Sequence, residues 1–249
     1  MRYLHLFRNI SNWSLYFAVK FSLSNVDPLL FKTRNNLLVE VPRRLLHEFK
    51  EIFMEECYMR GLGSNIPDSP TIIDIGANAG FFSLFVASRF PGAKIFSYEP
   101  IDSNFRQLQR NRGLNENCQI MSFPKAVAGQ SGEISLSFDP SDSFTTAATI
   151  FGECTKIDKT IQVPCVTLSE IFEEHHLKRC DLLKMDCEGA EYSILYNCPP
   201  DYLERIAQLA IEVHQGSGSE QNIEALGDYL SGSGFQIRKH EHMLWGWRF

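Results

Sequence analysis

The sequence predicts an α/β fold built on a mostly parallel sheet whose last strand is antiparallel. From residue 71 onward, short apolar runs alternate with amphipathic segments, a spacing typical of parallel strands joined by helices. The strand-like segments 235–240 and 243–249 have a connection too short for a parallel crossover, so they must form an antiparallel hairpin. A strand that runs directly into a glycine-containing turn and a helix at 71–80 predicts a ligand site at the carboxyl edge of the sheet.

Residues 1–67 are predicted to form an N-terminal helical cap, and residues 68–249 the main domain. A short strand is expected at 37–41. A helix is expected at 44–60, because its apolar residues recur on one face. Gly61, Gly63 and Pro67 then break the pattern, which indicates a linker between the cap and the main domain.

The main domain is expected to contain alternating strands and helices with one insertion. The strands are predicted at 71–75, 94–98, 119–123, 181–185 and 206–213, and the helices at 80–89, 102–112, 168–177, 190–196 and 219–230. Thr167 and Glu170 form a capping-box pattern before one of these helices. The alternating segments 133–138 and 159–166 predict an inserted β-hairpin, with a mobile tip in the polar loop 139–149.

The composition predicts a cytoplasmic protein that does not bind nucleic acid. The formal net charge is −6, and no segment supplies the concentrated basic stripe that phosphate backbones require. Seven cysteines form no C-x-x-C pair and suit a reducing compartment, and they offer no zinc-ligand pattern.

The first 23 residues are rich in aromatic and aliphatic side chains but are interrupted by charge. They lack the ~20 uninterrupted apolar residues of a membrane span, and no small-residue cleavage site follows. An amphipathic helix packed on the domain is the expected structure, and a helix lying on a membrane surface is the alternative.

The turn after the first strand of the main domain predicts a nucleoside cofactor. Gly76 allows a sharp turn, Asn78 tolerates positive φ, and Gly80 opens a helix whose free N–H groups point at a ligand. Glu99 lies roughly twenty residues after the turn, where nucleotide-binding folds place the acid that binds ribose hydroxyls. Asp74 before the first glycine suits a cationic amino group better than a pyrophosphate, which favours S-adenosylmethionine over a dinucleotide.

Four segments carry a family resemblance: D-I-G-A-N-A-G at 74–80, Y-E-P at 98–100, K-A-V-A-G at 125–129 and L-L-K-M-D-C-E-G-A-E-Y-S-I-L at 182–195. Together they resemble the FkbM-type methyltransferases, which use S-adenosylmethionine to methylate hydroxyls of sugars and secondary metabolites on a Rossmann-like class I methyltransferase sheet. The resemblance extends from about residue 37 to the C-terminus. Ala79, Cys187 and Gln130 depart from residues common in the family, but the cofactor motifs are intact.

The resemblance implies a distribution of cofactor contacts along these motifs. The methionine end would be lined by Asp74, Gly76, Ala77, Asn78 and Gly80, and the ribose would be bound by Glu99. Pro100 and Ile101, with Ala126 and Val127, would lie along the rest of the cofactor, the last three at the adenine.

Methyl transfer to a hydroxyl needs an aligned oxygen and an acceptor for its proton. Asp186 and Glu188 follow the strand 181–185 and are predicted to orient the hydroxyl, and His214 is the candidate general base because imidazole titrates near neutrality. Acids at a helix N-terminus can also be purely stabilising, and His214 can be an ordinary loop residue. We expect no metal, although the two carboxylates leave a divalent ion open.

The residues leave two other functions open: a nicotinamide-dependent oxidoreductase and a non-catalytic domain that binds a nucleoside. The expected partner is a small-molecule or glycan hydroxyl acceptor whose identity the sequence does not reveal. A homo-oligomer remains open as well.

Overall fold

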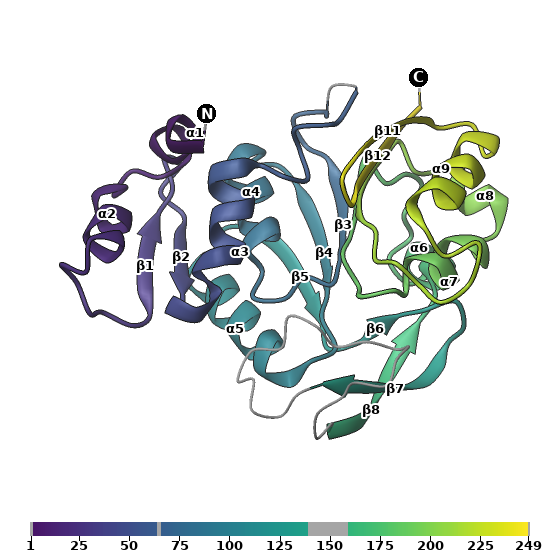
Figure 1. Ribbon diagram of the computed structural model, residues 1–249, viewed down its shortest axis with the longest axis horizontal. Coiled ribbons are helices and arrows are strands. Elements are labelled where there is room, and N and C mark those ends of the chain that lie inside the picture. Colours follow the sequence, from purple (N-terminus) through teal and green to yellow (C-terminus); the bar gives the residue numbers. More distant parts are fainter. Residues whose placement is uncertain (1, 64–65, 139–158, 249) are drawn as a thin grey trace.

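A seven-stranded sheet forms the centre of the molecule, with helices on both faces (Figure 1). The computed structural model describes residues 2–63, 66–138 and 159–248. In the order across the sheet, the strands are β11 (Gln236–His240), β12 (Met243–Trp247), β10 (Gln208–Glu212), β9 (Leu182–Met185), β3 (Thr71–Ile75), β4 (Lys94–Tyr98) and β5 (Gln119–Phe123). Strands β3, β4, β5, β9 and β10 are parallel, and β12 is antiparallel to both of its neighbours. The predicted architecture is confirmed.

Both faces of the sheet are buried: alternate residues of each strand point to opposite faces and pack into two different apolar cores. Ile72 and Leu182 belong to the core shared with helix α4 and the N-terminal segment. Their neighbours Ile73 and Leu183 belong to the core under helices α6, α7 and α9. The helices of the main domain are α4 (Phe81–Arg89), α5 (Asp102–Gly113), α6 (Leu168–Glu174), α7 (Glu191–Tyr196), α8 (Pro200–Leu203) and α9 (Ile223–Gly232).

The helix starts follow local side-chain chemistry. Thr167 and Glu170 form the predicted capping box at the start of α6. Helix α9 begins at Ile223, four residues later than predicted, because the Asn222 side chain accepts hydrogen bonds from the first N–H groups there. The short helix α8 was not predicted.

The predicted insertion is a small sheet of its own, in the order β6 (Ala126–Val127), β8 (Lys159–Val166) and β7 (Gly132–Phe138). Strands β7 and β8 pair in antiparallel register as the predicted hairpin. The tip at 139–149, which we predicted to be mobile, lies outside the described residues. Strand β6 was not predicted; it follows β5 after two residues and pairs in parallel with β8.

The N-terminal region differs from the prediction in detail. It contains α1 (Arg2–Asn9), α2 (Ser14–Lys20), β1 (Leu29–Lys32), β2 (Leu38–Val41), the 3-10 helix η1 (Arg43–Leu45), α3 (Leu46–Lys50) and the π-helix η2 (Glu51–Glu55). The segment 1–23 forms two helices because Ile10 leaves the helix to bridge to Thr33. The helix predicted over 44–60 stops at Glu55, where Glu56 adopts a left-handed conformation. None of the helices in the described ranges is long and apolar enough to cross a membrane.

The N-terminal region shares one apolar core with α4, in which Phe49 stacks on Phe53 and meets Phe81 edge-on. The division into subdomains at residue 67 stays a prediction.

A buried carboxylate, Glu56, joins helix α1 to helix α4. It accepts hydrogen bonds from Arg8 and Asn9. On its other side it accepts one from Arg89 at 2.9 Å. Burial by itself raises the pKa of Glu56, but these donors outweigh it and hold the pKa at about 2.

We predict that Glu56→Gln lowers the free energy of unfolding by about 2 kcal/mol near pH 7, because a neutral amide replaces a charge-assisted acceptor. The folded-state pKa of Glu56 lies below the ordinary value of 4.5, so the wild type's advantage is present above that value and lost as the pH falls toward 2. Urea unfolding across this range measures it. Glu55→Gln is the control, since Glu55 is 38% exposed and 3.6 Å from Arg2. An equal loss in both variants would contradict the assignment.

Candidate active site

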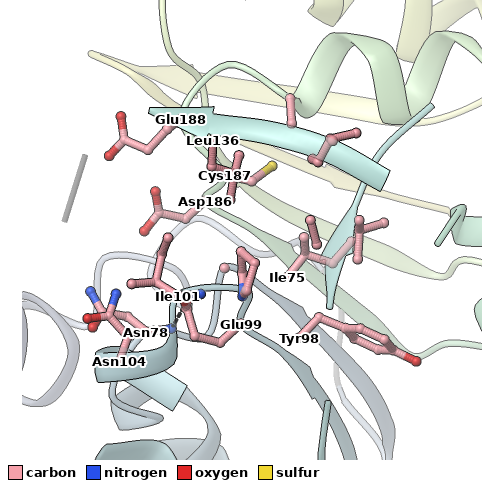
Figure 2. A pocket seen from close by; sticks show the side chains of 16 residues that line it. Ile75, Asn78, Tyr98, Glu99, Ile101, Asn104, Leu136, Asp186, Cys187 and Glu188 are labelled. Carbon is pink, nitrogen blue, oxygen red and sulfur yellow. Dashed lines mark hydrogen bonds between the residues drawn. The ribbon is translucent and has the colours of Figure 1, made fainter. Parts of the chain in front are cut away.

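A cavity of about 630 Å³ opens at the carboxyl ends of β3, β4 and β9, between the main sheet and the inserted hairpin (Figure 2). Of the residues predicted to bind the cofactor, seven line it: Gly76, Asn78, Glu99, Pro100, Ile101, Ala126 and Val127. Ile134, Leu136 and Asn104 line it as well and were not predicted. Hairpin residues carry no nucleotide motif, so nothing in the sequence marked them.

The glycine turn has the backbone geometry that its residues predict. Gly76, Asn78 and Gly80 have φ values of +70°, +48° and +80°. The N–H groups of Gly76 and Ala77 both donate to the carbonyl oxygen of Tyr98 at 3.0 Å, which fixes the turn against β4. Gly80 precedes α4 without lining the cavity, and Ala77 lines a neighbouring cavity.

Glu99 is held at the base of the cavity by backbone N–H groups. Its two carboxylate oxygens accept from Asn78 N at 2.8 Å and Ile101 N at 2.9 Å (Figure 2). Burial raises the pKa of Glu99 to about 7, opposed by these two donors. A fixed acceptor of this kind suits a pair of ribose hydroxyls, and the apolar walls at Ile101, Val127 and Leu136 suit a flat aromatic base. The pocket therefore fits an adenosine group.

Asp74 does not line this cavity, and its contact with the methionine end of the cofactor stays a prediction. It is fully buried, and its carboxylate accepts from Ser83 of α4 at 2.6 Å and lies 3.3 Å from Lys184 Nζ. Asp74 and Lys184 are directly opposite each other on β3 and β9. The acid before the glycine turn thus pairs with a lysine of the protein, a partner that sequence spacing could not reveal.

Lys184 ties the loops that frame the site. Its ammonium group donates to the carbonyl oxygens of Gly76 at 2.7 Å and Ile75 at 3.3 Å, and lies 3.8 Å from Asp186 Oδ2. Burial lowers the pKa of Lys184, but the charges of Asp74 and Asp186 outweigh burial and raise it. Lys184 therefore stays charged, and its hydrogen bonds hold the glycine turn beside β9.

A second cavity, of about 430 Å³, adjoins the first and shares Gly76, Asn78 and Asp186 with it. The N-terminal region forms its other wall, through Glu48, Glu51 and Tyr58. The Tyr58 hydroxyl lies 2.8 Å from Asp186 Oδ2 and 3.2 Å from Glu212 Oε2. Burial and the charge of Asp186 raise the pKa of Tyr58, so the phenol stays protonated and donates. Tyr58 was not predicted, because 128 residues separate it from Asp186.

Asp186 and Glu188 project to the same side of the loop after β9 (Figure 2). Residues two apart also share a side in extended backbone, but here the strand has already ended at Met185, and Glu188 and Gly189 have φ values of +53° and +100°. This left-handed turn places both carboxylates at the mouth of the cofactor cavity.

His214 lies between two acids. Its Nδ1 is 3.0 Å from Glu191 Oε1, and its Nε2 is 3.5 Å from Glu188 Oε2. Burial lowers the pKa of His214, but the hydrogen bond to Glu191 and the charges of Glu191 and Glu188 outweigh it and raise the pKa to about 9. Burial raises the pKa of Glu188 to about 7, opposed by His214. His214 is thus a charged imidazolium near neutral pH. The sequence prediction instead made it a general base, which has to be neutral at that pH.

Asp186, Glu188 and His214 each offer one ligand atom, and these atoms lie within 4.8 Å of one another. They are the residues in the described ranges that could hold a divalent ion, with Glu191 behind His214 as an orienting acceptor. The positive charge of His214 already offsets the negative charge of Glu188, so this group of side chains does not require an ion. We keep the prediction of a metal-independent site, and loss of activity on chelation would contradict it.

The strand order and the acid-containing pocket at the glycine turn define a Rossmann-like, S-adenosylmethionine-dependent methyltransferase. The profile described as "Methyltransferase FkbM domain" matches residues 74–243. The chain belongs to this family, which confirms the resemblance, the class of enzyme and the cofactor.

Related proteins agree with this assignment. The chain is 29% identical to methyltransferase sdnD of Sordaria araneosa, with 77% of this chain and 82% of the relative covered. It is 26% identical to 31-O-demethyl-FK506 methyltransferase FkbM of Streptomyces tacrolimicus, covering 76% of this chain and 81% of that protein. A crystal structure of methyltransferase FkbM from Methylobacillus flagellatus KT superposes with a TM-score of 0.54 at 18% identity over 82% of this chain. The chain spans about half (54%) of that solved chain.

We predict that Gly76→Ala lowers the affinity for S-adenosylmethionine at least about a hundredfold, because it misplaces the turn. A Cβ there would lie 1.7 Å from the carbonyl oxygen of Asp186, at a φ of +70°. Isothermal titration calorimetry measures the affinity. Gly113→Ala is the control, because a Cβ at the end of α5 meets nothing within 4 Å. Unchanged affinity in the Gly76 variant would contradict the assigned geometry.

Proposed function

We propose that the protein transfers a methyl group from S-adenosylmethionine to a hydroxyl oxygen of a sugar, glycan or secondary metabolite. The observation that carries the proposal is the pair of carboxylates, Asp186 and Glu188, at the mouth of the cofactor cavity. A relative named as a 31-O-demethyl-FK506 methyltransferase supports oxygen as the methyl acceptor. When bound, S-adenosylmethionine supplies the electrophilic methyl group.

Glu188 is the group we propose to receive the hydroxyl proton. Its raised pKa, about 7, makes it a stronger base than an ordinary carboxylate while leaving it largely ionised at slightly alkaline pH. Glu188 would take the hydroxyl proton as the hydroxyl oxygen accepts the methyl group and the methyl–sulfur bond breaks to leave the neutral thioether S-adenosylhomocysteine. The proton would then pass from Glu188 to water. His214 acts on Glu188 by its charge and keeps the carboxylate in place.

Asp186 is proposed to orient the acceptor hydroxyl. Tyr58 and Lys184 both approach its Oδ2 atom, so the position of that oxygen is fixed. The other oxygen is then left to accept from the substrate. The second cavity beside Asp186 is the proposed acceptor site, and its wall of Glu48 and Glu51 from the N-terminal region favours a neutral or cationic acceptor over an anion.

Assays of methyl transfer from labelled S-adenosylmethionine to a panel of sugars and hydroxylated metabolites test the proposed acceptor class. Transfer only to nitrogen or carbon acceptors would contradict it. We further propose a cytoplasmic location and no nucleic-acid partner, in line with the net charge of −6.

We predict that Glu188→Gln lowers kcat by about a hundredfold or more, while the affinity for S-adenosylmethionine changes less than about threefold, because the amide cannot take the proton. Asp186→Asn should lower kcat with a rise in acceptor KM. Glu241→Gln removes a charge from a carboxylate that is 69% exposed and serves as the control.

The pH dependence of kcat/KM provides the matching readout. It should rise through about 7 as Glu188 loses its proton, and fall near 9 as His214 loses its own. In Glu188→Gln, the rise of kcat/KM near pH 7 should disappear. If this variant keeps both the wild-type kcat and the rise near pH 7, Glu188 is not the base.

A further inference from the structure

The segment 2–30, which contains α1, α2, the start of β1 and the loops between them, carries most of the exposed large apolar side chains. Within the described residues, nine large hydrophobic side chains are exposed, and eight of them lie in the first 30 residues. They are Tyr3, Leu4, Phe7, Trp13, Phe21, Leu23, Val26 and Leu30. Figure 1 shows α1, α2 and β1 together at one end of the molecule, away from β11 and β12. Apolar exposure concentrated in this way marks an interaction site.

The aromatic side chains on this surface form one connected group. Phe17 of α2 is its hub, with ring centroids 5.7 Å from Tyr3, 6.0 Å from Trp13 and 6.3 Å from Phe21. Trp13 in turn meets Phe7 edge-on at 5.0 Å. The group therefore presents a preformed aromatic surface that needs no rearrangement to bind.

Cations border the aromatic surface. Lys20 Nζ lies 5.0 Å from the centroid of the Tyr3 ring and 5.7 Å from that of Phe21. Arg2 lies 5.7 Å from the Tyr3 ring centroid, and Arg34 donates to the carbonyl oxygen of Phe7. Side chains that carry charge beside exposed aromatic rings suit the boundary between acyl chains and headgroups.

The charge of this region is opposite to that of the rest of the chain. Residues 2–34 contain five Lys and Arg against the single acid Asp27, and the remaining residues contain 19 Lys and Arg against 29 Asp and Glu. Glu55 and Glu56 offset part of this charge at Arg2 and Arg8, while Lys20, Lys32 and Arg34 add to it. An anionic surface would attract this end and repel the other, so it would orient the molecule.

We propose that α1, α2 and β1 form a docking surface for an anionic lipid bilayer, into which the exposed aromatic and aliphatic side chains insert. A second copy of the chain is a poorer fit, because a symmetric contact would bring Arg2, Lys20 and Arg34 against their own copies. The proposal does not depend on the identity of the methyl acceptor.

Co-sedimentation with vesicles tests the proposal on the whole chain. Vesicles of phosphatidylcholine with about 30 mol% phosphatidylserine should bind the protein, and pure phosphatidylcholine should bind it at least about tenfold more weakly. Arg2→Gln with Lys20→Gln should lower binding by about twenty-five-fold, since each cation contributes about fivefold. Leu4→Ser with Phe21→Ser should lower it at least about tenfold, because these side chains are 68% and 61% exposed.

Leu114→Ser is the matched control, because Leu114 is 40% exposed but lies after α5. It should bind like the wild type. The emission of Trp13 gives a second readout. Trp245 and Trp247 are 1% and 9% exposed, so a blue shift of tryptophan emission on adding vesicles would come from Trp13. In Trp13→Phe this shift should disappear while binding remains.

Equal binding of the wild type and the surface variants, or binding to neither vesicle, would overturn the proposal. A wild-type dimer in light scattering that the same variants convert to monomer, without vesicle binding, would assign the surface to a second copy instead. Circular dichroism of each variant checks that the fold is retained.

Discussion

The active site depends on one buried ammonium group, that of Lys184. It lies at the carboxyl end of β9, opposite Asp74 of β3, and donates to the carbonyl oxygens of the glycine turn. An unpaired charge at this depth would be too costly to retain, and Asp74 and Asp186 offset that cost. The pair holds the turn that shapes the cofactor cavity and, on its other side, fixes Asp186.

The N-terminal region completes this arrangement. Tyr58 reaches Asp186 because the chain around it is held against β12: Trp245 donates its indole N–H to the Tyr58 carbonyl oxygen at 2.9 Å, and Gly61 packs flat on the same ring. The buried Trp245 of the last strand therefore also positions a residue of the site. This coupling explains how a cap and a cofactor-binding sheet can share one site.

The sequence revealed what local chemistry determines. The strands 71–75, 94–98 and 119–123 match residue for residue, because short apolar runs between turns leave few alternatives. The glycine turn and Glu99 were found for the same reason. Long-range pairing was invisible: Asp74 meets Lys184, and Tyr58 meets Asp186, across more than a hundred residues. His214 was predicted to be a neutral base because its two acidic neighbours could not be counted from spacing alone.

A double-variant cycle on Asp74 and Lys184 tests the central claim most directly. Lys184→Met alone should destabilise the protein by about 3 to 5 kcal/mol, because Asp74 is left buried without its partner. Asp74→Leu with Lys184→Met should recover most of that stability. This stable double variant should still bind S-adenosylmethionine at least about tenfold more weakly than the wild type, because the glycine turn has lost its donor. Wild-type affinity in the double variant, measured by calorimetry, would contradict the account.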